Sequence, residues 1–470
     1  MRLFVLKNNY KFIIWLILSF VIVLVGYSLR KDDYATVPLP GTSMDEYSYS
    51  WVGLSLIETG YPVGISGIDG YKNQLYKYIN VDDVYQSTAG GNPLKINYPW
   101  FDHPPTLGLI TGGYAWMKGA RTFEETNAYL IRKPMLWLGS LTLASLMVLL
   151  LINSGYVASV VGGIMWATIP SVVISSRMIQ AENGVIPFWL LSLIFISLYR
   201  KNRKLGYLIF AGLLAGVVTL FKLSGIVCLL SSIVILLSDS RRYLKRDLMV
   251  FFFYYSLIAS LFVVYGLIID PYQFIAIFLS NSSRYYGIGS EAVLKLLTQT
   301  KLTNLKYITE PWLLVSWLAF FVALSRKKLS VYAISLCSYL AIYIFFGSYP
   351  YGWYSFPFWP FLIAELAVLL SSSIRSVVSP LWAFWSLLLV GGYYLTKFVN
   401  IEEFQRFSSW WKNSIFIISV LLMIVSVMKK KAGWMKYLSA LLLVLMFTVA
   451  VYLSYKFLRT IDIDYWYKLS

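Results

Sequence analysis

The sequence predicts an all-α polytopic membrane protein of about thirteen transmembrane helices. Of its 470 residues, 58% are hydrophobic and only 13% are charged. Soluble domains carry roughly 25% charged residues, and apolar runs long enough to cross a bilayer recur along this chain. A large segment between the first two runs predicts juxtamembrane helices outside the membrane.

Thirteen apolar runs, separated by polar or basic breaks, are the predicted transmembrane helices. The first run is longer than the apolar region of a signal peptide, and no small-residue cleavage site follows it. We therefore expect an uncleaved first helix. The predicted spans are residues 12–29, 134–152, 157–175, 184–199, 206–221, 223–238, 248–269, 311–325, 329–346, 356–372, 377–396, 413–428 and 434–456.

The distribution of charge predicts the orientation in the cell membrane. The formal net charge is +18. If the N-terminus is cytoplasmic, the cytoplasmic segments hold 19 Lys and Arg against 2 acidic residues, and the remainder holds 21 against 20. This is the bias of the positive-inside rule, so the basic excess requires no nucleic-acid partner. Thirteen spans then place the C-terminus outside the cytoplasm.

The chain divides into two predicted modules. Residues 1–372 form the first, which includes the external segment 30–133, and residues 373–470 add C-terminal transmembrane helices. The external segment contains 11 acidic residues together with aromatic and apolar patches. It is too apolar for a disordered loop, so we expect a folded cap on the membrane. Cys228 and Cys337 fall inside apolar runs and provide neither a disulfide framework nor a metal cluster.

An acidic pair heads a predicted amphipathic helix in the external segment. Asp45 and Glu46 precede "YSYSWVGLSLIE", whose apolar residues recur at helical spacing. In one interpretation Glu46 completes a capping box with Ser43, and Asp45 favours the positive end of the helix. In the other, Asp45 points into a cavity at the membrane surface and acts as a general base.

A second polar pair closes the same segment. Asp102 and His103, the only histidine, precede Pro104 and Pro105 and then an apolar helix from about Thr106. Proline fixes the backbone, so both side chains are held in place. Asp102 is either the N-cap of that helix or, with His103, part of a site for a phosphate or a divalent metal ion. A lone Asp-His pair is a weak metal signal.

Further charged and aromatic residues lie near the predicted external ends of the spans. Charges at a membrane boundary are costly, and they are usually paired or functional. An interfacial aromatic belt explains the aromatic turn "GSYPYGWYSFPF" equally well. For the glycine-containing loop "NSSRYYGIGSEA", a plain solvated loop is as good an interpretation as a gating loop. The residues concerned are Arg177, Glu182 and Lys222, Tyr349 and Tyr354 in "GSYPYGWYSFPF", and Arg284 and Tyr285 in "NSSRYYGIGSEA".

In this order and on one predicted side of the membrane, these features resemble the GT-C superfamily of integral-membrane glycosyltransferases. The families they resemble most are the protein O-mannosyltransferases and the lipid A aminoarabinose transferases, from Arg2 to about Leu370. The resemblance implies that a hexose or pentose passes from a polyprenyl-phosphate donor to an extracytoplasmic acceptor in a single inverting displacement.

The resemblance also implies roles for individual residues. Asp45 matches the catalytic base, and Glu46 matches a residue that helps to hold the donor or the acceptor. Asp102 and His103 match a pair near the lipid phosphate, where the aminoarabinose transferases usually have Glu-Lys. Arg177, Glu182, Lys222 and the turn from Tyr349 to Pro357 match positions around the donor, although no arginine accompanies the turn here.

Two other functional classes stay open on the sequence. A lipid-linked glycan polymerase or ligase also uses polyprenyl carriers, but ligases tend to carry their large external loop late in the chain. A lipid-linked glycan transporter or flippase requires charges at mid-membrane depth. Only Glu365 clearly lies within a span, whereas the other charges gather near the predicted outer surface.

Overall fold

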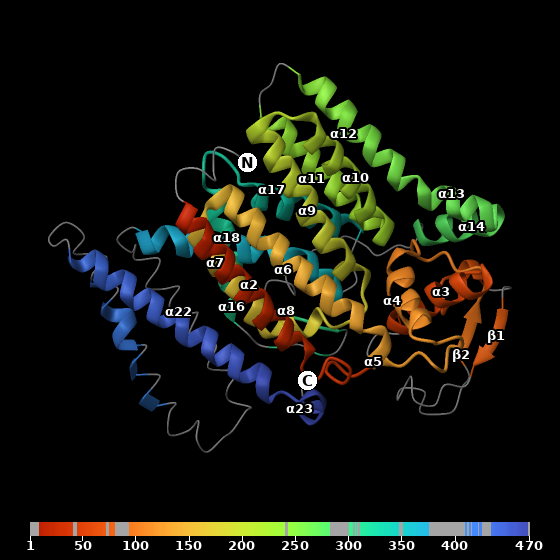
Figure 1. Cartoon of the computed structure of the whole chain (residues 1–470), viewed down its shortest axis with the longest axis horizontal. Coiled ribbons are helices and arrows are strands. Elements are labelled where there is room, and N and C mark those ends of the chain that lie inside the picture. Colours follow the sequence, from red (N-terminus) through yellow and green to blue (C-terminus); the bar gives the residue numbers. More distant parts are fainter. Residues whose placement is uncertain are drawn as a thin grey trace.

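A computed structural model gives the structure of the chain, a bundle of long helices with a smaller unit at one end (Figure 1). The structure describes residues 9–40, 45–71, 75–79, 94–239, 243–282, 300–303, 306, 308, 311–346, 351–375, 409–410, 413–414, 416–421, 423–424 and 434–468.

Eleven of the predicted spans correspond to helices among these residues. Six helical segments are long and apolar enough to cross a membrane, and five apolar helices are shorter. The predicted span 377–396 and most of 413–428 lie outside the described residues. The helices are α2 (Asn9–Lys31), α6 (Lys133–Ser154), α7 (Tyr156–Thr168), α8 (Pro170–Ser175), α9 (Ala181–Asn202), α10 (Leu205–Phe221), α11 (Ile226–Leu237), α12 (Leu244–Ala259), α13 (Leu261–Ile269), α16 (Pro311–Leu324), α17 (Val331–Phe346), α18 (Trp359–Arg375) and α22 (Trp434–Thr460).

Three of the predicted spans, 206–221, 223–238 and 157–175, test how the chain breaks between helices. The tight pair 206–221 and 223–238 is confirmed as α10 and α11, which a short 3-10 turn joins. The single span 157–175 is wrong, because it consists of α7 and α8. Pro170 is the first residue of α8 and the preceding Ile169 is extended, since a proline disfavours helical geometry in the residue before it.

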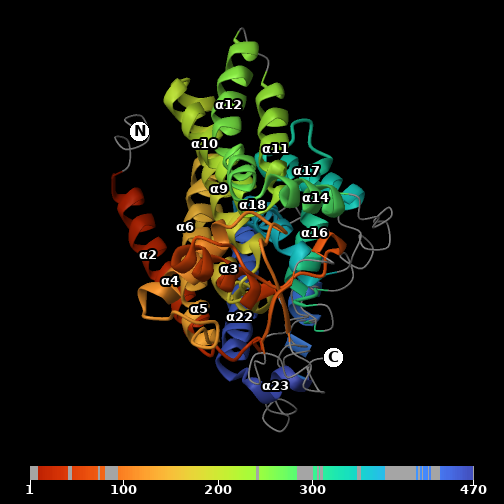
Figure 2. The same ribbon diagram turned by 90° about the vertical axis from the view of Figure 1, so that its right-hand side faces the viewer.

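Burial separates a central pair of helices from a peripheral set. The apolar windows of α9 and α18 are 78% buried, whereas those of α2 and of α12–α13 are 22% and 17% buried. Figure 2 shows α2 and α12 at the outside of the bundle. The peripheral helices therefore present most of their apolar side chains outward, as helices that face lipid do.

The charge inside α18 is neutralised locally. Glu365 is fully buried, accepts a hydrogen bond from the Ser330 hydroxyl and lies 3.7 Å from Nη1 of Arg326. Both partners precede α17. The sequence alone identifies no counterpart for this carboxylate, which the structure pairs with neighbouring residues.

The ends of the first and last membrane helices meet. Arg459 near the end of α22 binds the Asp32 carboxylate and donates to the Ser28 hydroxyl at 3.3 Å. The C-terminal ends of α2 and α22 therefore lie at the same end of the bundle, as an odd number of crossings requires. Which membrane face this end occupies stays a prediction.

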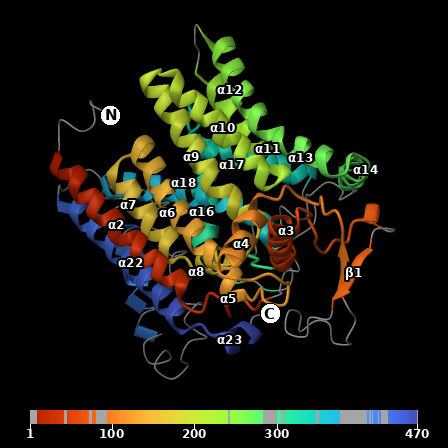
Figure 3. The same cartoon turned by 45° about the vertical axis from the view of Figure 1, so that its right-hand side comes forward.

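The external segment forms the smaller unit at one end of the bundle. It contains α3 (Asp45–Thr59), α4 (Thr106–Met117), the short α5 (Ala128–Ile131), and an antiparallel pair of strands, β1 (Leu75–Ile79) and β2 (Leu94–Asn97). The all-α prediction missed this hairpin. Figure 3 shows α3 and α4 between the hairpin and the bundle, near α14 (Pro271–Ser282).

Glycines allow the backbones of α3 and α4 to touch. A Cβ atom on Gly53 would lie 1.8 Å from the carbonyl oxygen of Gly108, and one on Gly112 would lie 2.2 Å from that of Ser50. No other residue type fits such an approach. The hydroxyl of Ser50 donates to Thr111 Oγ1 at 3.1 Å in the same contact. The two helices are therefore held as one unit.

Candidate active site

The first turn of α3 carries the acidic pair. Asp45 is the first residue of the helix and is partly exposed, whereas Glu46 is 1% exposed. A carboxylate at a helix N-terminus interacts favourably with the helix dipole. Ser43, the expected partner in a capping box, lies outside the described residues.

Glu46 forms a bidentate ion pair with Arg132, which sequence reasoning did not identify. Nε and Nη2 of Arg132 donate to the two carboxylate oxygens at 2.8 and 2.7 Å. The backbone N–H of Ile179 adds a third bond at 3.2 Å, and Arg132 Nη1 donates to the carbonyls of Tyr34 and Pro38. These bonds tie the start of α3 to three other segments.

Tyr49, one turn beyond Asp45, packs against the second polar pair. Its ring stacks on the His103 imidazole with centroids 5.7 Å apart, and Trp100 meets it edge-on at 5.9 Å. Tyr49 is 2% exposed, and His103 is partly exposed. The stack joins the two ends of the external segment, as the close packing of α3 on α4 requires.

The charges of carboxylates from three parts of the chain affect Tyr49. Burial raises the pKa of its hydroxyl well above the usual value, and the charges of Asp45, Glu182 and Asp102 raise it further. These side chains are therefore close enough to act on one buried group. The structure brings together residues that the sequence separates by up to 137 positions.

Lys222 is the cation of this cluster. Its ammonium lies 2.6 Å from Oε1 of Glu182 and 4.4 Å from the centre of the Tyr354 ring. Burial lowers the pKa of Lys222, but the charge and hydrogen bond of Glu182 together with the Tyr354 side chain outweigh burial, and the net pKa is raised. Asp45 contributes in the same direction. Lys222 therefore stays protonated beside the two carboxylates.

Asp102 is held from two sides and does not cap α4. The N-cap residue of α4 is Pro105, with no side-chain cap, so the capping interpretation of Asp102 is wrong. Its backbone carbonyl accepts a bond from Asn281 of α14 at 3.1 Å, and its carboxylate raises the pKa of Tyr71, after the larger effect of burial. Asp102 therefore lies where α14 meets the external segment.

Arg177 makes contacts away from this cluster. It is fully buried, and its Nη atoms donate to the carbonyls of Val37 and Leu29 at 2.9 and 2.8 Å. Burial lowers the pKa of its guanidinium to about 10. Its hydrogen bonds connect the last turn of α2 to the segment that follows it. The predicted residues Tyr349, Arg284 and Tyr285 lie outside the described residues.

The side chains present do not by themselves complete a metal site. In the described part of the chain, no group of three His, Cys, Asp or Glu residues could hold a metal ion, and Glu182 already binds Lys222. Asp102 as a metal ligand stays a prediction.

A family model and solved structures match the chain. Residues 102–269, about a third of the chain, match the family described as dolichyl-phosphate-mannose-protein mannosyltransferase. This match begins at Asp102 and includes Glu182 and Lys222. No curated protein matches the chain by sequence.

Three membrane glycosyltransferases are similar in structure. ArnT from Cupriavidus metallidurans, bound to undecaprenyl phosphate, has a TM-score of 0.52 and 15% identity over 96% of this chain and 78% of its own. AglB from Archaeoglobus fulgidus is an archaeal oligosaccharyltransferase, in complex with an inhibitory peptide and a dolichol-phosphate. It has a TM-score of 0.55 and 12% identity over 96% of this chain. Arabinosyltransferase EmbB from Mycobacterium smegmatis has a TM-score of 0.52 and 14% identity over 94% of this chain.

The lengths of these proteins differ. The chain covers 56% of AglB and 40% of EmbB, so it matches only part of either protein. The likeness extends over nearly all of this chain in each comparison. Together with the family match, it identifies the fold: the chain is a multi-pass membrane protein with the fold of the GT-C integral-membrane glycosyltransferases.

Proposed function

We propose that the protein transfers a sugar from a polyprenyl-phosphate donor to an extracytoplasmic acceptor, with Asp45 as the general base. The observation that carries the proposal is the stack of Tyr49, one turn beyond Asp45, on His103. The charges of Asp45, Asp102 and Glu182 all raise the pKa of the buried Tyr49 hydroxyl, after the larger effect of burial. Lipid phosphates bound to ArnT and AglB support a donor of this class. This reading is favoured over a flippase because Glu365 is paired locally.

The proposed reaction is one displacement at the anomeric carbon of the donor. The acceptor hydroxyl gives its proton to the Asp45 carboxylate as its oxygen bonds to that carbon. The bond from the carbon to the phosphate oxygen breaks at the same time, and the lipid phosphate leaves with the electron pair. The configuration of the sugar is therefore inverted.

The leaving phosphate needs positive charge or hydrogen-bond donors nearby. Lys222 provides the ammonium, and its pairing with Glu182 and contact with Tyr354 fix its position. His103, stacked on Tyr49, places an imidazole at the other side of the cluster. We assign both to the donor phosphate. Glu46 is then a positioning residue, because its carboxylate is occupied by Arg132.

The test uses the purified protein in lipid vesicles with a labelled polyprenyl-phosphate hexose. Release of free lipid phosphate is expected from the wild type, and Asp45→Asn should abolish it while leaving the thermal unfolding temperature unchanged. Asp32→Asn is the matched control, because Asp32 also lies outside the membrane but binds Arg459. Sugar turnover retained in Asp45→Asn would exclude Asp45 as the base, and translocation of the donor without bond cleavage would favour a flippase.

A further inference from the structure

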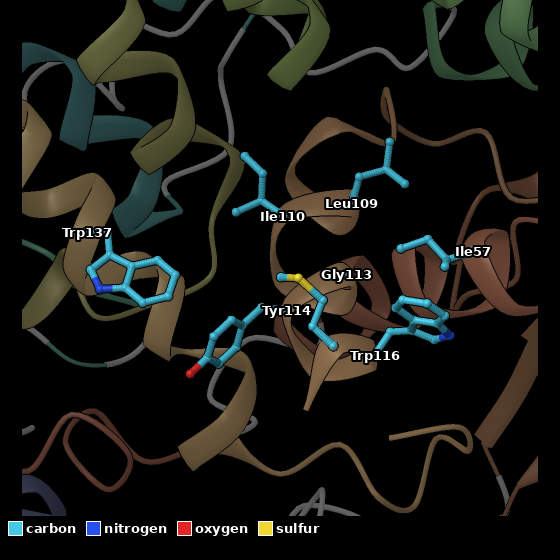
Figure 4. A pocket seen from close by; sticks show the side chains of 8 residues that line it. Ile57, Leu109, Ile110, Gly113, Tyr114, Trp116 and Trp137 are labelled. Carbon is cyan, nitrogen blue, oxygen red and sulfur yellow. The ribbon is translucent and has the colours of Figure 1, made fainter. Parts of the chain in front are cut away.

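An apolar groove lies along α4, beside its glycine contact with α3. It has a volume of about 470 Å³ and lies between α4, the end of α3 and the start of α6. Figure 4 shows Trp137 of α6 across the hollow from Leu109 and Ile57. Its main walls are Leu109, Ile110, Tyr114 and Trp116, together with Ile57 and Trp137. We call this hollow the α4 groove.

The groove leaves large apolar side chains uncovered. Trp137 is 48% exposed, Leu109 41% and Met117 69%. Clustered apolar exposure of this kind marks a surface that contacts a protein, a membrane or a ligand. The volume is within the range of roughly 300–1,000 Å³ that is usual for small-molecule sites.

The groove continues into the membrane-facing surface of α6. Trp137 lies in the first turn of this span, and Leu141, Ala144 and Val148 follow it at helical spacing. These four residues are exposed or partly exposed, whereas the residues between them are mostly buried. The stripe therefore faces lipid, and the groove lies at the end of the stripe that carries Trp137.

The rim of the groove, which contains Tyr114, Lys118 and Arg121, has the composition of a membrane interface. Tyr114 meets Trp137 edge-on at 5.2 Å, and the ammonium of Lys118 lies 5.7 Å from the centre of the Tyr114 ring. The guanidinium of Arg121 covers the Trp116 ring at 4.8 Å. Aromatic residues with adjacent basic residues gather at the headgroup level of bilayers.

We propose that the α4 groove binds one acyl chain of a bilayer phospholipid, with the phosphate beside Lys118. The apolar walls receive the chain from the stripe on α6, and the rim meets the headgroup. Arg121 lies 3.6 Å from Glu58, whose carboxylate also accepts a bond from the Trp116 indole at 2.7 Å. Glu58 offsets the charge of Arg121, and the phosphate beside Lys118 is common to zwitterionic and anionic phospholipids, so we expect both to bind. The site lies outside the proposed reaction and does not depend on it.

The experiment measures contact between Trp137 and a lipid chain. The full chain is placed in phosphatidylcholine vesicles with brominated or unmodified acyl chains, and the emission of Trp137 is taken as the difference between wild type and Trp137→Phe. Bromine quenches indole emission on contact, so this difference should be largely lost in brominated vesicles. Brominated phosphatidylglycerol should give the same loss.

Filling the groove separates a bound chain from ordinary lipid contact. Gly113→Leu places a side chain in the groove, where its Cβ would meet only the flexible end of Ile57 at 3.2 Å, and should restore the Trp137 emission. Ala144→Leu, on the same stripe below the groove, is the matched control and should restore nothing. If Gly113→Leu fails to fold, Leu109→Phe fills the rim instead.

Two results would overturn the proposal. Equal quenching in wild type and in the filled variants would mean that Trp137 contacts only the surrounding bilayer. Recovery of emission on adding polyprenyl phosphate would assign the groove to the isoprenoid tail of that lipid instead of a phospholipid chain.

Discussion

Arg132 grips Glu46 through two parallel hydrogen bonds, 2.8 and 2.7 Å long, and both side chains are 1% exposed. A guanidinium and a carboxylate match in this geometry. Because Asp45 is the residue immediately before Glu46, the ion pair fixes the backbone that carries the proposed base. Its loss should therefore affect stability and activity together.

Breaking this ion pair should destabilise the protein strongly. Removing one partner of a buried pair costs about 3–5 kcal/mol, because the other charge stays buried. We expect Arg132→Met to lower the thermal unfolding temperature and to abolish transfer. The exposed pair Arg121–Glu58 is the control, since surface pairs contribute roughly 0–1 kcal/mol. Arg121→Met unfolding at as low a temperature as Arg132→Met would contradict this ranking.

Adding one methyl group between α3 and α4 should separate them. Gly53→Ala puts a Cβ 1.8 Å from the Gly108 carbonyl, and backbone atoms cannot rotate away. Overpacking typically costs about 1–3 kcal/mol, and the displaced α3 should also lower the rate of transfer. The control is Gly67→Ala, where nothing lies within 4 Å of the added Cβ. Equal unfolding temperatures for the two variants would disprove the tight contact.

His103 should bind the donor through its imidazole and support Tyr49 through its ring. His103→Phe keeps an aromatic ring against Tyr49, so we expect normal unfolding and weaker binding of polyprenyl phosphate. His103→Ala should lose both properties. Unfolding temperature and lipid-phosphate affinity, measured on the same preparations, distinguish the two roles. Wild-type affinity in His103→Phe would remove His103 from the phosphate site.

The contact between Arg459 and Asp32 predicts where the C-terminal end lies. A cysteine at Tyr467, which is 52% exposed, should react with a membrane-impermeant maleimide applied to intact cells. A cysteine at Asn202, at the predicted cytoplasmic end of α9, should react only after permeabilisation. The unmodified chain controls for Cys228 and Cys337. The reverse labelling pattern would invert the predicted orientation.

The helices were predictable because their apolar runs are a local property of the sequence. The α3 helix begins at Asp45 and α4 at Thr106, as expected. The acidic pair, Asp102 and Lys222 were found because charge is rare in this chain. A local pattern could not separate Asp45 from Glu46, whose difference is set by a partner 86 residues away.

The other differences between the predicted and the observed structure also arise from contacts between distant parts of the chain. Arg177 has the sequence context of a site residue, yet carbonyls far away in the chain occupy its guanidinium. Tyr49 looks like one more residue of an apolar stripe, and only tertiary packing stacks it on His103. The hairpin strands are five and four residues long, too short to give a distinct alternating pattern within a polar loop.

The contact of Gly53 with Gly108 has a mechanical consequence. Because no side chain separates the two backbones at this contact, α3 and α4 move together there. The α4 helix also carries Trp116, one turn beyond Gly112, and Tyr114, residue types that gather at the boundary between hydrocarbon and water. If a thinner or thicker bilayer displaces α4, Asp45 is displaced with it, relative to a sugar that arrives on a lipid.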